Sequence, residues 1–342
     1  MSKRFLNIMW LLATCFYVVA YAELLPPFQT SQTGTPMADT SYNTINTVLS
    51  QAPWFKFTWE SLKLPNDEIM DRAAMMVSAK LPDTDTRFQH MVFQLDTGAN
   101  MSLLYEISAH DQLPAALYAS TDRPLSSLML QFDGPFQNTV KFELLKNFGE
   151  QADSSPEAAD SVPEIGTLGM DFFANAGAGF AIDYKNQHIY ILSRKLLDNI
   201  MTPYPDHFMT YQETYQGMKG KILLPIKIDD VEELVIFDTG SSMAELITPP
   251  PLWQQITGLN TGNPTVKRFV APSWGKQMTV LRGEVDKKIY IAGQWEQLKE
   301  VQTAIPYPGG DVSIIGNGLF FDDVIVVDTV NKKFGLFQRS AK

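Results

Sequence analysis

Short apolar runs separated by turn residues form the main pattern of the chain after residue 72. Residues 73–81 and 89–95 are two such runs, and turn residues at 82–85 lie between them. Apolar runs of this length, bounded by Pro, Asp and Thr, are typical of β-strands. The pattern therefore predicts a hairpin whose second strand ends at Asp96, the first residue of an Asp-Thr-Gly sequence.

The same pattern returns in the second part of the chain. Residues 220–228 and 233–237 predict another hairpin, whose second strand ends at Asp238 in a second Asp-Thr-Gly. Two hairpins that each run into the same tripeptide are an internal repeat. The sequence therefore predicts a mainly β, all-β fold built from two homologous halves.

Elements downstream of the two hairpins repeat as well. An apolar run leads to Gly169 in the first half and to Gly316 in the second. A further apolar strand then ends at Asp183 or Asp328, and in both places Asn follows three residues later. Asp and Asn at this spacing favour a turn stabilised by their side chains, so each half is expected to close with a second hairpin.

The repeat and the stretches between its parts predict five segments. These are a signal peptide at 1–22, an N-terminal extension at 23–72, a first lobe at 73–197, a linker at 198–215 and a second lobe at 216–342. Pro203, Pro205 and scattered polar residues place the linker.

Three shorter stretches have their own character. The aromatic residues at 54–59 predict one strand or short helix that packs on the body of the protein. Residues 149–164, rich in Ala, Ser, Asp, Glu and Pro, are expected to form a solvated loop. The three prolines at 249–251 predict a rigid bend at the surface.

The first residues have the pattern of an export signal. Basic residues at 1–4 precede an apolar run at 5–20, and Ala20-Tyr21-Ala22 matches a cleavage site. The alternative is an uncleaved membrane anchor, although the run is shorter than the roughly 20 residues that a membrane span needs. Cys15 is the sole cysteine and lies inside this signal. We therefore expect an exported protein without disulfides, periplasmic or secreted and with no stable membrane insertion after cleavage.

Composition and charge exclude several classes of function. The 342 residues are 45% hydrophobic and 19% charged, which is ordinary for a globular protein. A net charge of −11 argues against nucleic acid and anionic membranes as partners. The four histidines are scattered without the spacing of metal ligands, and neither a glycine-rich phosphate loop nor a Gly-x-Ser-x-Gly sequence occurs. We expect no metal and no cofactor.

The two Asp-Thr-Gly sequences carry the candidate chemistry. Each aspartate ends an apolar strand, where a carboxylate is costly to bury. Halves related by a two-fold axis would bring Asp96 and Asp238 together, and two adjacent carboxyl groups share one proton. The ionised group can then activate water while the protonated group donates to a carbonyl. The alternative is a pair of structural turns in a duplicated β fold.

The residues around each aspartate fit this arrangement. Gly98 and Gly240 allow backbone amides to approach the carboxylates, and Thr97 and Thr239 are expected to lock the two loops together. At the next position, Ser241 is expected to donate a hydrogen bond to Asp238. Ala99 holds the equivalent place in the first half and has no hydroxyl, so the site is expected to be asymmetric.

The motifs resemble those of a known family. Residues 95–99 resemble the active-site loop of retropepsin-type aspartic peptidases, and residues 237–242 resemble that of pepsin-like enzymes. Leu168-Gly169 and Ile315-Gly316 resemble the element that passes behind each loop in this clan. The resemblance covers residues 73–192 and 220–338. It implies a bilobal acid protease fold with pseudo-two-fold symmetry, a cleft between the lobes, and cleavage of extended polypeptide without cofactor. Separately, we expect a monomer.

The sequence has two candidates for the flap that closes the cleft in this family. Phe132-Asp133-Gly134 is a candidate in the first half, although it lacks the Tyr of pepsin-like flaps, and Phe132 equally fits a core position. Trp274-Gly275 is a candidate in the second half and equally fits an ordinary turn.

Two rival functions stay open on the sequence alone. One is a catalytically silent peptide-binding or inhibitor protein on the same fold, and the other is a structural envelope protein. Retention of both aspartates with their glycines favours the aspartic endopeptidase, with an activity optimum on the acidic side of neutrality.

Overall fold

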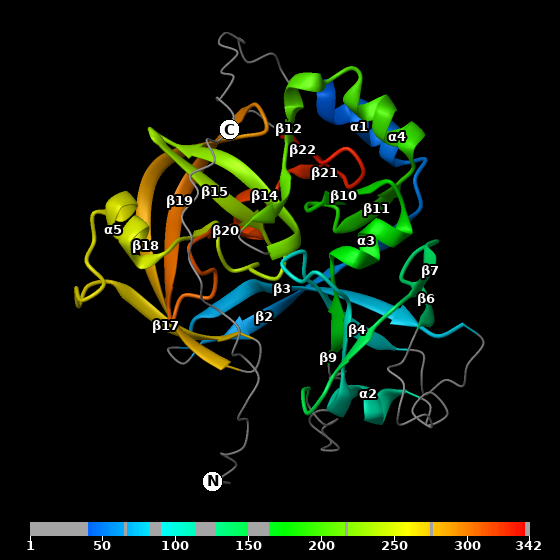
Figure 1. The fold of residues 1–342 in the computed structure, drawn as a ribbon, viewed down its shortest axis with the longest axis horizontal. Coiled ribbons are helices and arrows are strands. Elements are labelled where there is room, and N and C mark those ends of the chain that lie inside the picture. Colours follow the sequence, from blue (N-terminus) through cyan, green and yellow to red (C-terminus); the bar gives the residue numbers. More distant parts are fainter. Residues whose placement is uncertain are drawn as a thin grey trace. The chain divides into compact units, whose positions relative to one another are not determined.

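β-strands form most of the structure (Figure 1), as the alternation of short apolar runs and turns predicts. The computed structural model describes residues 40–64, 67–82, 90–113, 127–149, 164–215, 218–273 and 276–338. The predicted signal peptide and most of the 149–164 stretch lie outside these ranges. No helix in the described ranges has the length and apolar character needed to cross a membrane.

The first half of the repeat lies in an eight-stranded sheet with the order β7-β6-β3-β4-β9-β5-β8, in which β2 also pairs with β3. Its strands are β2 (Thr58–Lys63), β3 (Ile69–Lys80), β4 (Met91–Leu95), β5 (Leu103–Tyr105), β6 (Leu128–Phe132), β7 (Gln137–Val140), β8 (Glu143–Leu145) and β9 (Glu164–Leu168). Helix α2 (Glu106–Gln112) follows β5, and α3 (Met170–Ala176) follows β9.

The second half lies in another eight-stranded sheet, ordered β13-β14-β15-β20-β16-β19-β18-β17. Its strands are β13 (Gln212–Tyr215), β14 (Met218–Ile228), β15 (Val231–Phe237), β16 (Leu246–Ile247), β17 (Lys267–Ser273), β18 (Lys276–Ile291), β19 (Gln294–Ile305) and β20 (Ser313–Ile315). Helix α5 (Pro250–Thr257) follows β16, and the 3₁₀ helix η5 (Asn317–Phe320) follows β20.

Equivalent strands of the two sheets pair in the same way. Strand β9 lies parallel to β4, with Leu168 opposite Leu95, and β20 lies parallel to β15, with Ile315 opposite Phe237. Next to these pairs, β5 runs antiparallel to β9 and parallel to β8, just as β16 runs antiparallel to β20 and parallel to β19. The internal repeat read from the sequence is therefore also a repeat of strand topology.

A six-stranded sheet, ordered β1-β11-β10-β21-β22-β12, takes strands from both halves (Figure 1). Its strands are β1 (Trp54–Lys56), β10 (Gly179–Asp183), β11 (His188–Leu192), β12 (Phe208–Thr210), β21 (Val324–Asp328) and β22 (Lys333–Phe337). The central pair is antiparallel β10 and β21, one from each half. This shared sheet joins the two halves through backbone hydrogen bonds.

The turns that end β10 and β21 have the side-chain contacts that the sequence predicts. Asp183 accepts hydrogen bonds from the backbone and side-chain nitrogens of Asn186, at 3.0 and 2.9 Å. Asp328 accepts the same two bonds from Asn331, at 2.9 and 3.0 Å. Asp328 is thus a structural residue of a turn.

The N-terminal segment is built into the body. Helix α1 (Thr40–Leu49) lies beside α4 (Arg194–Met201), and its Ile45 and Leu49 are fully buried (Figure 1). Strand β1 then forms an edge of the six-stranded sheet, where Trp54 lies opposite Tyr190. The aromatic stretch at 54–59 therefore contributes two strands, β1 and β2, where one element was expected.

Two other expectations differ from the structure in detail. Residues 198–215, expected to be a linker, contain the end of α4, the 3₁₀ helix η4 (Pro205–His207), β12 and β13. The prolines at 249–251 begin helix α5, with Pro250 as its first residue. Proline is favoured at that position because its fixed φ suits a helix. A backbone N–H at the first helical position would have no partner within the helix, so its absence costs nothing.

Candidate functional site

Asp96 and Asp238 occupy equivalent places, one residue beyond β4 and one beyond β15. The backbone N–H of Asp96 donates to the carbonyl of Leu168, and that of Asp238 donates to the carbonyl of Ile315, both at 3.0 Å. The preceding residues, Leu95 and Phe237, are fully buried. Each aspartate is therefore held by a buried strand and by the parallel strand beside it.

The threonines of the two loops exchange hydrogen bonds, as expected from their positions. The backbone N–H of Thr97 donates to Oγ1 of Thr239 at 2.9 Å, and the N–H of Thr239 donates to Oγ1 of Thr97 at 3.0 Å. The two hydroxyls donate in turn to the carbonyls of Phe237 and Leu95, at 3.0 and 2.9 Å. Four buried, reciprocal bonds thus fix one loop against the other.

The glycines of the two loops face the opposite aspartates. A Cβ atom added to Gly98 would lie 2.5 Å from Oδ1 of Asp238, and one added to Gly240 would lie 2.8 Å from Cγ of Asp96. Real Cβ atoms do not approach other atoms so closely, so neither position has room for a side chain. Because these two positions lack side chains, the carboxyl groups of Asp96 and Asp238 can lie next to each other.

Different donors surround the two carboxyl groups. Oδ1 of Asp96 accepts a bond from the N–H of Ala99 at 3.0 Å. Oδ1 of Asp238 accepts from the N–H of Gly240 at 2.8 Å, and its Oδ2 accepts from the hydroxyl of Ser241 at 2.9 Å. The site is therefore asymmetric in the sense that Ala99 and Ser241 predict.

Burial and the neighbouring carboxyl group raise the pKa of Asp96 well above its usual range. Burial is the largest cause, since only 5% of Asp96 is exposed. The negative charge of Asp238 and a hydrogen bond between the two carboxyl groups raise this pKa further. The charge of Lys221 and the N–H of Ala99 oppose the rise. Asp96 thus retains its proton at a pH where an exposed aspartate is ionised. Asp96 and Asp238 are called the aspartate pair below.

Lys221 on β14 is a site residue that the sequence analysis missed. Its Nζ donates a hydrogen bond to the carbonyl oxygen of Gly98, and the charges of Asp96 and Asp238 both act on it. Burial lowers the pKa of Lys221, and the two carboxylates oppose that decrease. Comparison of the two hairpins was the available signal, because Ala74 holds the equivalent position in the first half.

The candidate flap residues of the first half lie in a packed region. Phe132 is 3% exposed and contacts the rings of Phe55, Phe136 and Phe172. Its neighbour Gly134 has a φ of 144°, and a Cβ there would lie 2.5 Å from the carbonyl oxygen of Trp54. Phe132 therefore occupies a core position, which was the alternative for this residue.

Strand topology relates this turn to a turn of the second half. Strand β6 pairs with β3 as β18 pairs with β14. A strand that follows in each half, β8 in the first and β19 in the second, runs parallel to β5 and to β16 respectively. The β6–β7 turn therefore corresponds to the β18–β19 turn. Trp274, the other flap candidate, lies outside the described residues, between the antiparallel strands β17 and β18.

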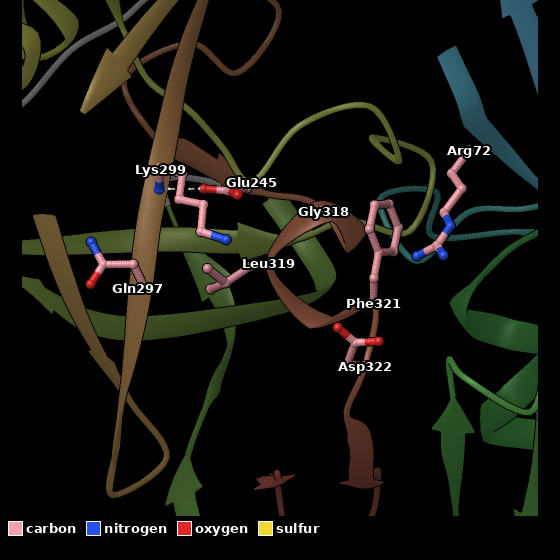
Figure 2. Close-up of a pocket in the computed structure, with 8 residues that line it drawn as sticks. All are labelled: Arg72, Glu245, Gln297, Lys299, Gly318, Leu319, Phe321 and Asp322. Atoms are coloured by element: carbon pink, nitrogen blue, oxygen red, sulfur yellow. Dashed lines mark hydrogen bonds between the residues drawn. The ribbon is translucent and has the colours of Figure 1, made fainter. Parts of the chain in front are cut away.

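A separate cavity of about 290 Å³ lies beside η5 (Figure 2). It is lined by Arg72, Glu245, Gln297, Lys299, Gly318, Leu319, Phe321 and Asp322. The carboxylate of Glu245 accepts hydrogen bonds from the backbone N–H groups of Lys299 and Glu300, at 2.7 and 3.1 Å. Neither aspartate of the pair lines this cavity, and its charged groups are of both signs.

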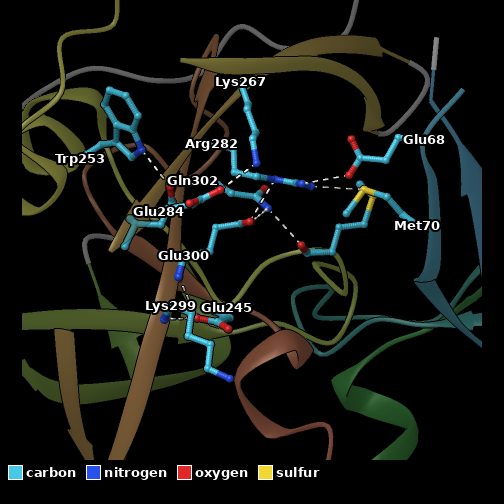
Figure 3. Close-up of polar contacts among 12 residues, drawn as sticks. Glu68, Met70, Glu245, Trp253, Lys267, Arg282, Glu284, Lys299, Glu300 and Gln302 are labelled. Atoms are coloured by element: carbon cyan, nitrogen blue, oxygen red, sulfur yellow. Dashed lines mark hydrogen bonds and ion pairs between the residues drawn. The ribbon is translucent and has the colours of Figure 1, made fainter. Parts of the chain in front are cut away.

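A polar cluster around Arg282 connects the β2–β3 turn with the second sheet (Figure 3). Arg282 on β18 forms ion pairs with Glu68 and with Glu300, both at 3.1 Å, and its side chain is 11% exposed. Its guanidinium also lies over the ring of Phe269, 5.0 Å from the centroid. These contacts join two parts of the chain and include neither aspartate of the pair. We therefore interpret them as structural.

Within the described ranges, no group of three or more His, Cys, Asp or Glu side chains is placed to hold a metal ion. No protein-family model matches the chain, and a search of curated proteins finds no significant match.

Proposed function

We propose that this protein is an aspartic endopeptidase that hydrolyses peptide bonds with Asp96 and Asp238. The observation that carries the proposal is the reciprocal placement of the two loops, in which each glycine faces the opposite carboxyl group and the threonines exchange hydrogen bonds. Structural turns need neither feature. Both features hold the two carboxyl groups close together, which is the condition for sharing one proton.

The reaction requires one ionised and one protonated carboxyl group. The ionised group accepts a proton from a water molecule, whose oxygen attacks the carbonyl carbon of the peptide. The protonated group donates its proton to the carbonyl oxygen, which gives a neutral tetrahedral intermediate. When the C–N bond breaks, the amine takes a proton from one carboxyl group while a hydroxyl of the intermediate gives a proton to the other, so the original protonation state returns. Because the two groups titrate as a unit, the roles belong to the pair.

We also propose an overall fold, a substrate and a cellular location for this protein. The repeated strand topology and the shared six-stranded sheet support a two-lobed, pepsin-like arrangement with a cleft between the lobes. Extended polypeptide is the proposed substrate, and the proposed form is an exported monomer that uses no cofactor. The signal-like first residues support export.

Cleavage of a denatured protein tests the proposal. Residues 23–342 are incubated with reduced, unfolded substrate from about pH 3 to about pH 7, with and without pepstatin. We expect cleavage that pepstatin inhibits, with an optimum on the acidic side of neutrality. Asp96→Asn and Asp238→Asn should each abolish it, while Asp322→Asn, which changes an exposed aspartate, serves as the matched control.

Two outcomes contradict the proposal. Wild-type protein that is folded yet cleaves nothing, and that co-purifies with peptide, would show the silent binding protein instead. Cleavage that survives Asp96→Asn at the wild-type rate would assign the reaction to other residues.

A further inference from the structure

The position of Lys221 follows from strand register. Strands β14 and β15 pair with Leu223 opposite Ile236, and this register, continued by two residues, places Lys221 beside Asp238. In the first hairpin Met76 lies opposite Gln94, so the same continuation places Ala74 beside Asp96. The two-fold repeat therefore has a cation on one side of the aspartate pair and a methyl group on the other.

The amine of Lys221 is tied to the loop of the opposite half. Its Nζ donates to the carbonyl oxygen of Gly98, the residue whose Cα faces the carboxyl group of Asp238. Lys221 is partly buried, and a partly buried cation beside two carboxyl groups interacts with them more strongly than an exposed one. One contact therefore fixes the amine next to both acids.

We propose that Lys221 is a positioning residue that stabilises the singly protonated, negatively charged state of the aspartate pair and thereby extends activity to lower pH. This inference rests on the proposed function. Without a cation, a buried pair of carboxyl groups takes up its second proton at higher pH, which leaves no ionised group to activate water. With Lys221 present, one carboxylate stays ionised in more acidic solution.

Few other charged or titratable groups face this site from the described elements. Lys221 interacts with Asp96 and Asp238, and Asp96 interacts with Asp238, Lys221 and the phenol of Tyr105. Burial keeps the pKa of Tyr105 above its usual range, so this phenol stays neutral in the range considered. The charge balance of the pair in acidic solution therefore depends on Lys221.

The pH profile of kcat/KM tests the inference. In Lys221→Met, both limbs of the profile should move to higher pH by about one unit or more, because an adjacent opposite charge shifts a carboxyl pKa by that amount. Lys221→Arg keeps the charge and should keep the limbs near their wild-type positions. Lys219→Met removes an exposed lysine from the same strand and is the control for a change in net charge. If Lys221→Met does not fold, Lys221→Gln replaces it.

The pH dependence of unfolding tests the same inference without activity. Loss of Lys221 raises the pKa of folded Asp96 further, so the free energy of unfolding should fall more from about pH 4 to about pH 7 than in the wild type. An active wild type whose Lys221→Met variant has unshifted limbs overturns the inference and leaves the proposed function intact. A wild type that cleaves nothing refutes the proposed function, and the unfolding comparison then decides whether Lys221 acts on the pair.

Discussion

At the scale of single residues, Asp96 combines a structural cost with the candidate chemistry. It is 5% exposed, it faces a second carboxyl group, and one backbone N–H donates to it. Ionisation of Asp96 therefore costs more in the folded protein than in the unfolded chain. The charge of Lys221 offsets part of that cost.

The raised pKa of Asp96 makes the stability of the protein depend on pH. A carboxyl group with a raised folded pKa contributes its full stability below the unfolded value of about 3.9, and this contribution is lost as the pH rises toward the folded value. Asp96→Asn removes that loss. The difference in free energy of unfolding, variant minus wild type, should grow between these two pKa values by up to about 1.4 kcal/mol per pH unit.

Urea denaturation at about pH 4 and about pH 7 measures this difference. Asp322→Asn, which removes an exposed carboxyl group, is the control for the loss of a carboxyl group outside the pair. If the free energy of unfolding of Asp96→Asn relative to wild type decreased as the pH rises, this would contradict a raised pKa for folded Asp96.

At the scale of elements, the parts of the repeat are joined by specific polar contacts as well as by the shared sheet. The ion pairs of Arg282 connect β18 to Glu68 in the β2–β3 turn and to Glu300 on β19 (Figure 3). The low exposure of this side chain distinguishes it from surface pairs, whose contribution to stability is small.

Arg282→Met should destabilise the protein by about 1.5–3 kcal/mol, the cost typical of losing hydrogen bonds to a charged group. The matched control is Lys267→Met, since Lys267 pairs with Glu284 at 2.7 Å on the exposed surface of the same sheet. Thermal or urea unfolding compares the two. Equal losses for both variants would show that the Arg282 cluster is no more than a surface contact.

Local sequence patterns predicted the elements that depend on neighbours in the chain. The strands that end at Asp96 and Asp238 and the Asp–Asn turns at the ends of β10 and β21 all follow from residues a few positions apart. The prolines before α5 show the limit of such patterns, because Pro fits both a bend and the first turn of a helix.

At the scale of the whole molecule, the features that the sequence did not predict depend on contacts between distant residues. Lys221 reaches the Gly98 loop through strand register, and Phe132 is buried because β1 crosses beside its turn. Helix α1 packs on α4 through Ile45 and Leu49, although no motif in its ten residues indicates which element it contacts. The repeat itself was predictable because the same sequence motifs occur in both halves, so equivalent long-range contacts could be expected in each.

Carbon-13 NMR titration of the aspartate carboxyl groups measures whether Asp96 and Asp238 hold one proton between them. The resonances are assigned with Asp96→Asn and Asp238→Asn. If the proton is shared, one proton should remain on the pair well above the usual range of an aspartate, and Asp238→Asn should lower the pKa of Asp96 because a neighbouring negative charge is removed. Two carboxyl groups that titrate independently at ordinary values, each unaffected by substitution of the other, would contradict a shared proton.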